Sequence, residues 1–453
     1  MATKKSKKEH KEKIEIVFPK DFMWGTAMSS HQVEGGNMYN DWWAWEQEGK
    51  VLNRQVSGDA CDHYHLYKKD FDMMQKMHHN THRLSIEWSR IEQKEGEFNK
   101  YEIQHYRKVL EDLRSKGIQP VVTLFHFTLP HWFAKNGGFL QKDARKIFNR
   151  FVKRVVNELG DLVDYWITVN EPYVYANFGY WEGVWPPGKK SIFKTLKVLK
   201  QLIYVHIDSY KSIKELYKKQ HWKNPQVGFA KNFIWFAPYK KETFLSKLLT
   251  RFYHYNYNKV YFRPFYSGRF PLILGFGKIP EAKESLDFVG MNYYFQCSCT
   301  YTSIKSPFHL REHFSPDQER TLFNWEVNAE GLYHVLKLIY LKIKKPILIT
   351  ENGISTLDDN QRTSYIIRHL DAINRAIRDG VDVKGYLYWS FIDNFEWAEG
   401  YSQFFGLNAM NQRTFERTPK PSAQVYAEIC KTGKITDNML KKYAKDLHDR
   451  DIK

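Results

Sequence analysis

Residues 165–172 read YWITVNEP, an apolar run that turns polar at Asn170 and Glu171 and stops at a proline. Residues 347–353, ILITENG, follow the same pattern, with Glu351 near the end of the run and a glycine behind it. Apolar runs without alternation are typical of strands buried on both faces of a parallel sheet. Proline and glycine then begin loops. Both stretches therefore predict parallel strands with a carboxylate at the carboxyl end.

Six further runs along the chain share this character. The eight strand candidates are residues 22–26, 81–87, 119–126, 165–170, 227–233, 286–293, 346–351 and 383–389. Segments with helical periodicity lie between them, such as residues 101–116, 143–159 and 362–378. Eight alternations of strand and helix in one chain predict an α/β fold, a single (β/α)8 TIM barrel.

The domain limits follow from composition. Residues 1–13 are rich in lysine and predict a basic disordered tail, residues 14–430 form the predicted barrel, and residues 431–453 predict a polar C-terminal helix or tail. No internal repeat and no linker rich in glycine, serine or proline divides the chain. We therefore expect one catalytic domain.

The predicted strand ends carry the side chains that could do chemistry. In chain order these are Arg83, Glu87, His126, Asn170, Glu171, Asn232, Asn292, Glu351 and Trp389. A barrel of parallel strands brings all its carboxyl ends to one mouth, where the active sites of this fold lie. The sequence therefore predicts a single pocket built from residues far apart in the chain.

Two glutamates in such a pocket indicate cleavage of a glycosidic bond. That reaction needs a proton for the leaving oxygen and a carboxylate to support the sugar carbon. Arg83 is placed to keep Glu351 ionised as the nucleophile, and the charge of Glu351 then keeps Glu171 protonated as the acid. A lone glutamate at a strand end is more often a surface ion-pair partner, so the prediction depends on the two occurring together.

At these residues the chain resembles glycoside hydrolase family 1, over residues 18–429. The motifs that carry the resemblance are residues 22–27 (FMWGTA), 30–35 (SHQVEG), 60–64 (ACDHY), 85–91 (SIEWSRI), 170–172 (NEP), 350–353 (TENG), 388–390 (YWS) and 393–401 (DNFEWAEGY). The resemblance implies a retaining exo-β-glycosidase that works by double displacement through a covalent glycosyl-enzyme intermediate, without a cofactor.

The same resemblance implies roles for individual residues. Glu171 would be the acid/base and Glu351 the nucleophile, with Arg83 and Tyr294 orienting Glu351. The residues implied to bind the sugar are Gln32, His126, Asn170, Asn292, Tyr294, Trp389, Glu396 and Trp397. Neutral amides, an imidazole and indole rings also suit a neutral polyol on chemical grounds.

Departures from the family pattern narrow the range of substrates that we expect. Family members that act on 6-phosphosugars have a serine in place of Glu396 and a lysine and a tyrosine at the positions of Gln403 and Phe405, so a phosphoglycosidase is not expected. Phe127 stands where many members have tryptophan, which removes an indole donor and is expected to relax specificity. Residues 233–287 and the loop after Glu351 look shortened, which predicts an open leaving-group side.

Several alternatives remain open from the sequence. A β-glucosidase with β-galactosidase and β-fucosidase activity is expected, but a transglycosylase would use the same two glutamates. A non-catalytic sugar-binding protein of the same fold would usually have lost one of them. The preferred sugar, the natural aglycone and the oligomeric state do not follow from the sequence. The expected ligand is a small β-glycoside or a short oligosaccharide.

Net charge and cysteine content limit which other functions and which cellular setting are expected. The formal net charge of +18 comes with no nucleic-acid-binding motif, so a solvated lysine-rich surface and no specific nucleic acid are expected. No segment is apolar enough to span a membrane, and four scattered cysteines predict no disulfide framework and a cytoplasmic setting. No metal is expected, since the histidine groups at 63–65 and 78–82 lack ligands at a metal-specific spacing.

Overall fold

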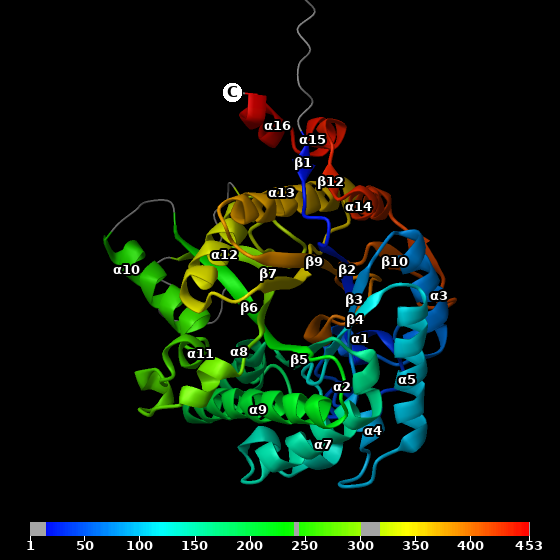
Figure 1. Cartoon of the computed structure of the whole chain (residues 1–453), viewed down its shortest axis with the longest axis vertical. Coiled ribbons are helices and arrows are strands. Elements are labelled where there is room, and N and C mark those ends of the chain that lie inside the picture. The colour runs from blue at the N-terminus through cyan, green and yellow to red at the C-terminus, as the bar shows by residue number, and fades with distance from the viewer. Residues whose placement is uncertain (1–14, 240–243, 300–317, 453) are drawn as a thin grey trace, which may run out of the picture.

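The computed structural model describes residues 15–239, 244–299 and 318–452. Eight parallel strands close into a barrel, and β2 pairs with both β3 and β9. They are β2 (Met23–Ala27), β3 (Thr81–Ser85), β4 (Gln119–Thr123), β5 (Tyr165–Asn170), β6 (Gln226–Pro238), β7 (Phe288–Cys299), β8 (Ile347–Asn352) and β9 (Val383–Trp389). Figure 1 shows the helices arranged outside this ring. The predicted (β/α)8 barrel is confirmed.

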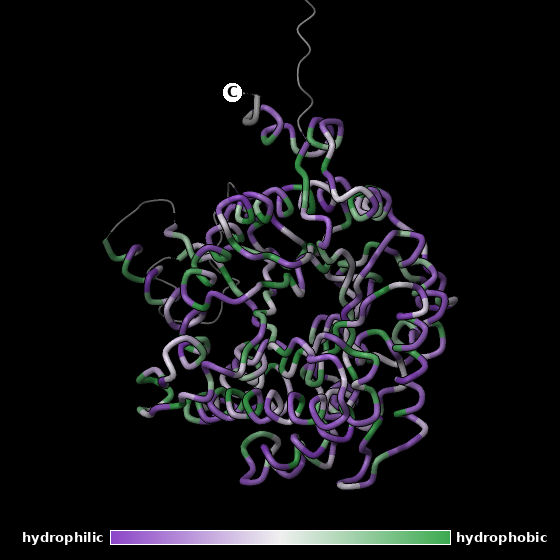
Figure 2. Tube along the Cα trace, viewed as in Figure 1, coloured by the Kyte–Doolittle hydropathy of each residue, from purple (hydrophilic) through white to green (hydrophobic). Residues whose placement is uncertain are grey.

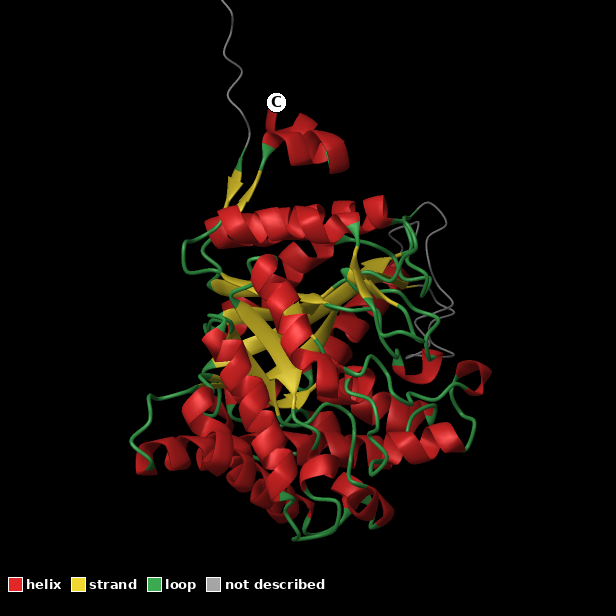
Figure 3. Ribbon diagram, turned by 90° about the vertical axis from the view of Figure 1, so that its right-hand side faces the viewer, coloured by secondary structure: helices red, strands yellow, loops and turns green. Residues whose placement is uncertain are grey.

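The helices cover the barrel on its outer side (Figure 3). Those on the barrel are α1 (Ser30–Val33), α2 (Asp41–Gln47), α3 (His63–Lys76), α4 (Trp88–Ile91), α5 (Lys100–Ser115), α6 (His131–Lys135), α7 (Ala144–Leu159), α8 (Pro172–Ala176), α9 (Ile192–Lys219), α10 (Phe244–Tyr253), α11 (Arg263–Ser267), α12 (Ala329–Ile343), α13 (Asp359–Arg378) and α14 (Pro421–Thr432). A π-helical segment, η5 (His254–Lys259), and a 3-10 turn, η9 (Trp397–Glu399), lie near the mouth.

Helix α5 illustrates why these segments are helical. Its buried residues are Ile103, Tyr106, Val109, Leu110 and Leu113, at the spacing of one helix face. The side chain of Asn99 accepts hydrogen bonds from the first free backbone N–H groups and so caps the helix. Figure 2 shows the resulting alternation of hydrophobic and hydrophilic residues along the outer helices. No helix among the described residues is long and apolar enough to cross a membrane.

Strands β6 and β7 extend well beyond the predicted ends at residues 233 and 293. They pair as far as Pro238 and Cys299, with a register shift after Phe233. The sequence analysis missed this extension because it ended both strands one residue after a polar residue, Asn232 or Asn292. Apolar side chains continue beyond both, so the two strands remain buried and paired. Asn232 and Asn292 therefore lie inside their strands.

Strands β3 and β4 end earlier than predicted, at Ser85 and Thr123. His126 consequently lies in the loop after β4. Glu87 follows β3 and caps α4, where its carboxylate accepts from the backbone N–H and the hydroxyl of Ser89. Glu87 is thus a structural residue of the β3–α4 turn.

The two ends of the described chain meet beside the barrel. The short strand β1 (Ile16–Val17) pairs with β12 (Lys434–Ile435), and α15 (Asp437–Tyr443) and α16 (Lys445–Ile452) follow. Arg368 on α13 donates to both oxygens of Asp446 at 2.7 and 2.6 Å. The short pair β10 (Asn408–Met410) and β11 (Arg417–Pro419) completes the fold. The predicted tail of residues 1–13 lies outside the described residues.

All four cysteines are free and buried, in line with the absence of a predicted disulfide framework. Cys297 and Cys299 lie in the extended part of β7, where they are packing residues.

Candidate active site

Arg83 is the centre of the polar network at the barrel mouth. Its side chain is almost fully buried, and its guanidinium contacts three other strands. Nε donates to the hydroxyl of Thr123 at 3.1 Å on β4, and one terminal nitrogen donates to Asn170 Oδ1 at 2.7 Å on β5. The other terminal nitrogen bonds the carboxylate of Glu351 on β8. Closure of the barrel therefore places one cation against the predicted nucleophile.

Asn292 joins the two predicted catalytic glutamates. Its amide nitrogen donates to Oε1 of Glu171 at 2.8 Å, and a hydrogen bond from the same side chain also stabilises the ionised form of Glu351. Its Oδ1 accepts from the hydroxyl of Thr350 at 2.6 Å, which holds the amide in this orientation. Both carboxyl groups therefore lie at the same face of the mouth, within reach of one side chain.

Glu351 is surrounded by groups that favour its charge. The Tyr294 hydroxyl donates to Oε2 at 2.5 Å, and Arg83 bonds Oε1. Burial raises the pKa of Glu351, while Arg83, Tyr294 and Asn292 oppose that rise. The pKa of Tyr294 is raised well above its usual range by burial and by Glu351, so the phenol remains a donor. This carboxyl is therefore the one of the pair that ionises first.

Glu171 has weaker support for a negative charge. Burial, and after it the charge of Glu351, raises the pKa of Glu171 to about 8. Its direct partners are neutral amides, Asn292 and Asn232, and Arg83 acts only through space. Its backbone has a φ of 44°, a left-handed conformation in the turn between β5 and Pro172 of α8. Glu171 is thus protonated at neutral pH and Glu351 is its charged neighbour.

Two of the predicted sugar-binding side chains, Gln32 and Glu396, lie next to each other. Gln32 Nε2 donates to the backbone oxygen of Phe395 at 2.8 Å and lies 3.4 Å from Glu396 Oε2. Burial, followed by the charges of Glu351 and Glu171, raises the pKa of Glu396 to about 8. Glu396 is therefore within electrostatic reach of both catalytic carboxyls.

Three nearly parallel rings lie beside this group. The imidazole of His126 lies 6.0 Å from Trp389 at 17° and 6.1 Å from Trp397 at 14°. Asn170 turns its Oδ1 to Arg83 and Asn292, so its Nδ2 faces His126 Nε2 at 3.2 Å. Nε2 is then an acceptor and the proton lies on Nδ1, which has no hydrogen-bond partner among the described residues. Burial and Arg83 hold the pKa of His126 far below its usual value, so the imidazole is neutral.

The geometry agrees with comparisons with known proteins. The family model of glycosyl hydrolase family 1 matches residues 14–435. The chain belongs to this family. A β-glycosidase from Pyrococcus horikoshii is 38% identical, with 95% of this chain and 98% of that chain covered and a TM-score of 0.85. A β-glucosidase from Thermotoga maritima in complex with deoxynojirimycin is 31% identical over 92% of this chain and 99% of its own, with a TM-score of 0.86.

A curated relative agrees with the solved structures. The 1,4-β-D-glucan glucohydrolase of Thermotoga neapolitana is 31% identical over 448 residues, which cover 93% of this chain and 99% of the relative. As a family 1 protein of nearly full length, the chain is an O-glycosyl hydrolase.

Gln403 and Phe405 stand at the two positions where a phosphate-binding lysine and tyrosine were considered above. Gln403 accepts from the hydroxyl of Ser355 at 2.8 Å, and Phe405 packs 6.0 Å from the Tyr294 ring. A phosphate beside these two side chains would meet an amide and a phenyl ring, neither of which carries a positive charge.

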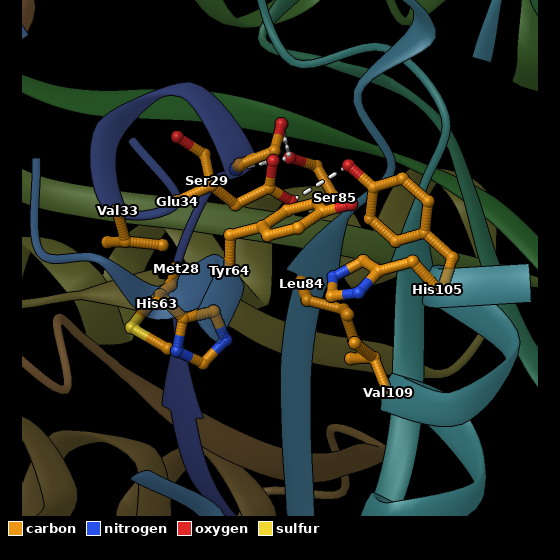
Figure 4. Close-up of a pocket in the computed structure, with 12 residues that line it drawn as sticks. Met28, Ser29, Val33, Glu34, His63, Tyr64, Leu84, Ser85, His105 and Val109 are labelled. Atoms are coloured by element: carbon orange, nitrogen blue, oxygen red, sulfur yellow. Dashed lines mark hydrogen bonds between the residues drawn. The ribbon is translucent and has the colours of Figure 1, made fainter. Parts of the chain in front are cut away.

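His63, one of the histidines considered above as a metal ligand, has structural partners. His63 Nδ1 pairs with Asp70 at 2.7 Å, and Asp70 also accepts from Arg417 at 2.7 Å. A small cavity beside His63 has a volume of about 20 Å³, enough for one water molecule (Figure 4). No group of three or more histidine, cysteine, aspartate or glutamate side chains in the described part of the chain could hold a metal ion.

Near Glu171, the sequence analysis missed Lys231 and Tyr257, and it noted Asn232 without giving it a role. The Tyr257 hydroxyl of η5 donates to Asn232 Oδ1 at 2.7 Å, and Asn232 in turn bonds Glu171. Lys231 is completely buried beside them. The available signal was a lysine inside the apolar run of residues 227–236, VGFAKNFIWF. Tyr257 left no such signal, because only the fold brings η5 to β6.

Proposed function

We propose that this family 1 enzyme is a retaining exo-β-glucosidase, with Glu171 as the acid/base and Glu351 as the nucleophile. The proposal depends on one observation. Asn292 joins the two carboxyls, but their other partners stabilise a negative charge to different degrees. Glu351 has a guanidinium and a phenol as partners, whereas Glu171 has only amides. Two carboxyls with opposite charge preferences at one mouth are what double displacement needs.

In the first step, an oxygen of Glu351 attacks the anomeric carbon of the β-glycoside. The bond between that carbon and the glycosidic oxygen breaks, and this oxygen takes the proton of Glu171 as the alcohol departs. A covalent glycosyl ester of Glu351 remains. Esterification removes the negative charge of Glu351, so the pKa of Glu171 falls and its carboxylate persists as a base.

In the second step, Glu171 takes a proton from water, and the water oxygen attacks the anomeric carbon. The ester bond breaks, Glu351 is released as a carboxylate, and the sugar leaves with its original β configuration. An alcohol in place of water would give transglycosylation at the same site. Product analysis with added alcohol measures how the intermediate divides between the two acceptors.

The proposed substrate is a small β-glycoside or short oligosaccharide with a neutral terminal sugar. Gln32 and Glu396 offer donors and acceptors to hydroxyls, with Trp389 as a flat apolar wall. The Thermotoga maritima enzyme has been solved both with glucoimidazole and with galacto-hydroximolactam. By analogy, we propose secondary β-galactosidase and β-fucosidase activities, since a carboxyl such as Glu396 can bond hydroxyls in either configuration.

The proposal extends to the leaving-group side and to location. We propose an open leaving-group side that tolerates varied aglycones; faster turnover of long oligosaccharides than of aryl glycosides would contradict it. Four free, buried cysteines support a reducing setting, and we propose the cytoplasm. Recovery of the enzyme outside the cytoplasm in a cell fractionation would contradict that location.

A panel of aryl β-glycosides tests the proposed function directly. Glu171→Ala is expected to lose activity on poor leaving groups, to retain glycosylation by 2,4-dinitrophenyl glucoside, and to yield β-glucosyl azide when azide is added. Glu351→Gly with azide is expected to form α-glucosyl azide. Glu111→Gln, on the exposed face of α5, serves as the control and is expected to match the wild type. Full activity of Glu351→Gln, or release of the α sugar by wild type, would exclude the mechanism.

A further inference from the structure

Lys231 is a completely buried lysine at the centre of β6. Its ammonium group donates one hydrogen bond, to the backbone oxygen of Asn232 at 2.6 Å. Three aromatic rings surround the same nitrogen: Phe233 and Tyr257 have centroids 4.5 Å away, and Tyr173 of α8 lies at 5.8 Å. Ring faces and a carbonyl oxygen are groups that stabilise a cation without water.

The charge of Lys231 has one counterpart nearby. Burial lowers the pKa of Lys231 well below its usual range, and among the described residues the charge of Glu171 partly opposes this lowering. The other residues that face Lys231 are Phe233 of its own strand, Tyr173 of α8 and Tyr257 of η5. The pKa values of Tyr173 and Tyr257 are raised by burial, so both phenols are neutral.

A buried ammonium requires a compensating negative charge. Glu171 supplies that charge only when it is ionised, and in the double-displacement cycle it becomes ionised each time it protonates a leaving group. The attraction between Lys231 and Glu171 is therefore strongest after proton donation. Such a cation favours the product of the proton transfer over its starting state.

We propose that Lys231 is the positioning residue that stabilises the ionised form of Glu171 and so sets how readily this acid gives up its proton. The inference rests on the acid/base role proposed above for Glu171. Asn232 and Tyr257 complete the arrangement: the lysine holds the main chain of Asn232, the tyrosine holds its side chain, and that side chain bonds the glutamate.

The proposal predicts the direction of two separate effects. Without the cation, the pKa of Glu171 rises, so the basic limb of the pH profile moves to higher pH. The weaker acid protonates poor leaving groups more slowly, whereas a 2,4-dinitrophenolate needs no proton to leave. Loss of rate should therefore be confined to substrates with poor leaving groups.

The test compares Lys231→Met and Lys231→Gln with Lys214→Met. Glutamine keeps a donor for the Asn232 carbonyl without the charge. Lys214, on α9, pairs with Asp287 at 2.7 Å, ahead of β7 and away from the mouth, so its loss controls for removal of a partly buried lysine. For each variant, kcat/KM is measured against pH with methyl and with 2,4-dinitrophenyl β-glucoside, together with the thermal midpoint.

Both Lys231 variants are expected to move the basic limb upward by about 0.5–1 pH unit. The ratio of the methyl to the dinitrophenyl rate should fall on the order of threefold. Lys214→Met is expected to change neither. An unchanged limb and ratio in a folded Lys231 variant, or an effect of methionine alone, would overturn the proposal. The acid/base role of Glu171 is tested separately. If that role were wrong, Glu171→Ala would keep wild-type activity on the methyl glucoside.

Discussion

Asn292 donates a hydrogen bond to Oε1 of Glu171 at 2.8 Å, and this contact ties the proposed acid/base to the strand beside the proposed nucleophile. Because Oδ1 of the same amide accepts from Thr350, the residue before Glu351, the orientation of Asn292 depends on both strands. The geometry of the catalytic pair therefore depends on one amide in β7.

Replacing that amide should disturb the pair more than it disturbs the fold. The hydrogen bond from Asn292 lowers the pKa of Glu171, so Asn292→Ala should raise this pKa and move the basic limb of kcat/KM to higher pH. We expect a loss in kcat on the order of 100-fold. Asn99→Ala, which removes only the cap of α5, is the control for stability and should leave the pH profile unchanged.

Tyr294→Phe should act on the opposite limb. The phenol donates to Oε2 of Glu351 and lowers the pKa of that carboxyl. Without the donor the pKa of Glu351 rises, the nucleophile is protonated at a higher pH, and the acidic limb moves up. A kcat reduced on the order of tenfold or more is expected at the pH optimum. If only the basic limb moved, the hydrogen bond from Tyr294 would not be what lowers the pKa of Glu351.

Glu396 should behave at pH 6 as a neutral acid, because its pKa is about 8. Glutamine resembles that form in size and charge, so Glu396→Gln should raise KM for aryl glucosides only a few-fold at this pH. Glu396→Ala leaves partners in the pocket unpaired and should cost about 2 kcal/mol, roughly 30-fold in KM. Equal losses in the two variants at pH 6 would indicate that the ionised form binds the sugar.

Phe127 should be a determinant of specificity. Its ring packs 5.3 Å from Trp397 and 5.0 Å from Trp185, and it has no donor for a sugar hydroxyl. Phe127→Trp should sharpen the preference for glucosides over their 3-deoxy analogues and lower the thermal midpoint, since the site is tightly packed. The comparison of kcat/KM for the two substrates measures the effect; an unchanged ratio would mean that the new indole does not reach the ligand.

Asp70 should contribute stability that depends on pH. Burial opposes its charge, but His63 and Arg417 lower its pKa below the ordinary value of 3.8. Its contribution is thus complete above about pH 4 and is lost as pH falls through the lowered folded value. Asp70→Asn should lower the unfolding free energy by about 3 kcal/mol at pH 7 and by less at pH 3.

Urea unfolding at both pH values measures this difference. The exposed pair of Lys337 with Asp379 supplies the control, because Asp379→Asn should leave the stability nearly unchanged at both pH values. A cost for Asp70→Asn that stays the same at both pH values would contradict the assigned cause.

The amino-acid sequence by itself determined the barrel and the strand beside which each of the two proposed catalytic glutamates lies. Apolar runs that end in a polar residue and a chain breaker are local signals, and they need no knowledge of partners. A polar residue is a wrong signal for the end of a strand where the strand carries a polar side chain in its interior. For this reason β6 and β7 were ended too early, at residues 233 and 293, one residue after Asn232 and Asn292.

Only the tertiary structure decided which groups meet. The contacts of Arg83 with Asn170 and Glu351 join three strands, and they depend on the register in which the barrel closes. The cage around Lys231 likewise needs η5 and α8 to pack against β6. Charge preference at a buried site is set by such neighbours rather than by residue type, so the unequal support of Glu171 and Glu351 became visible only when the strands were assembled.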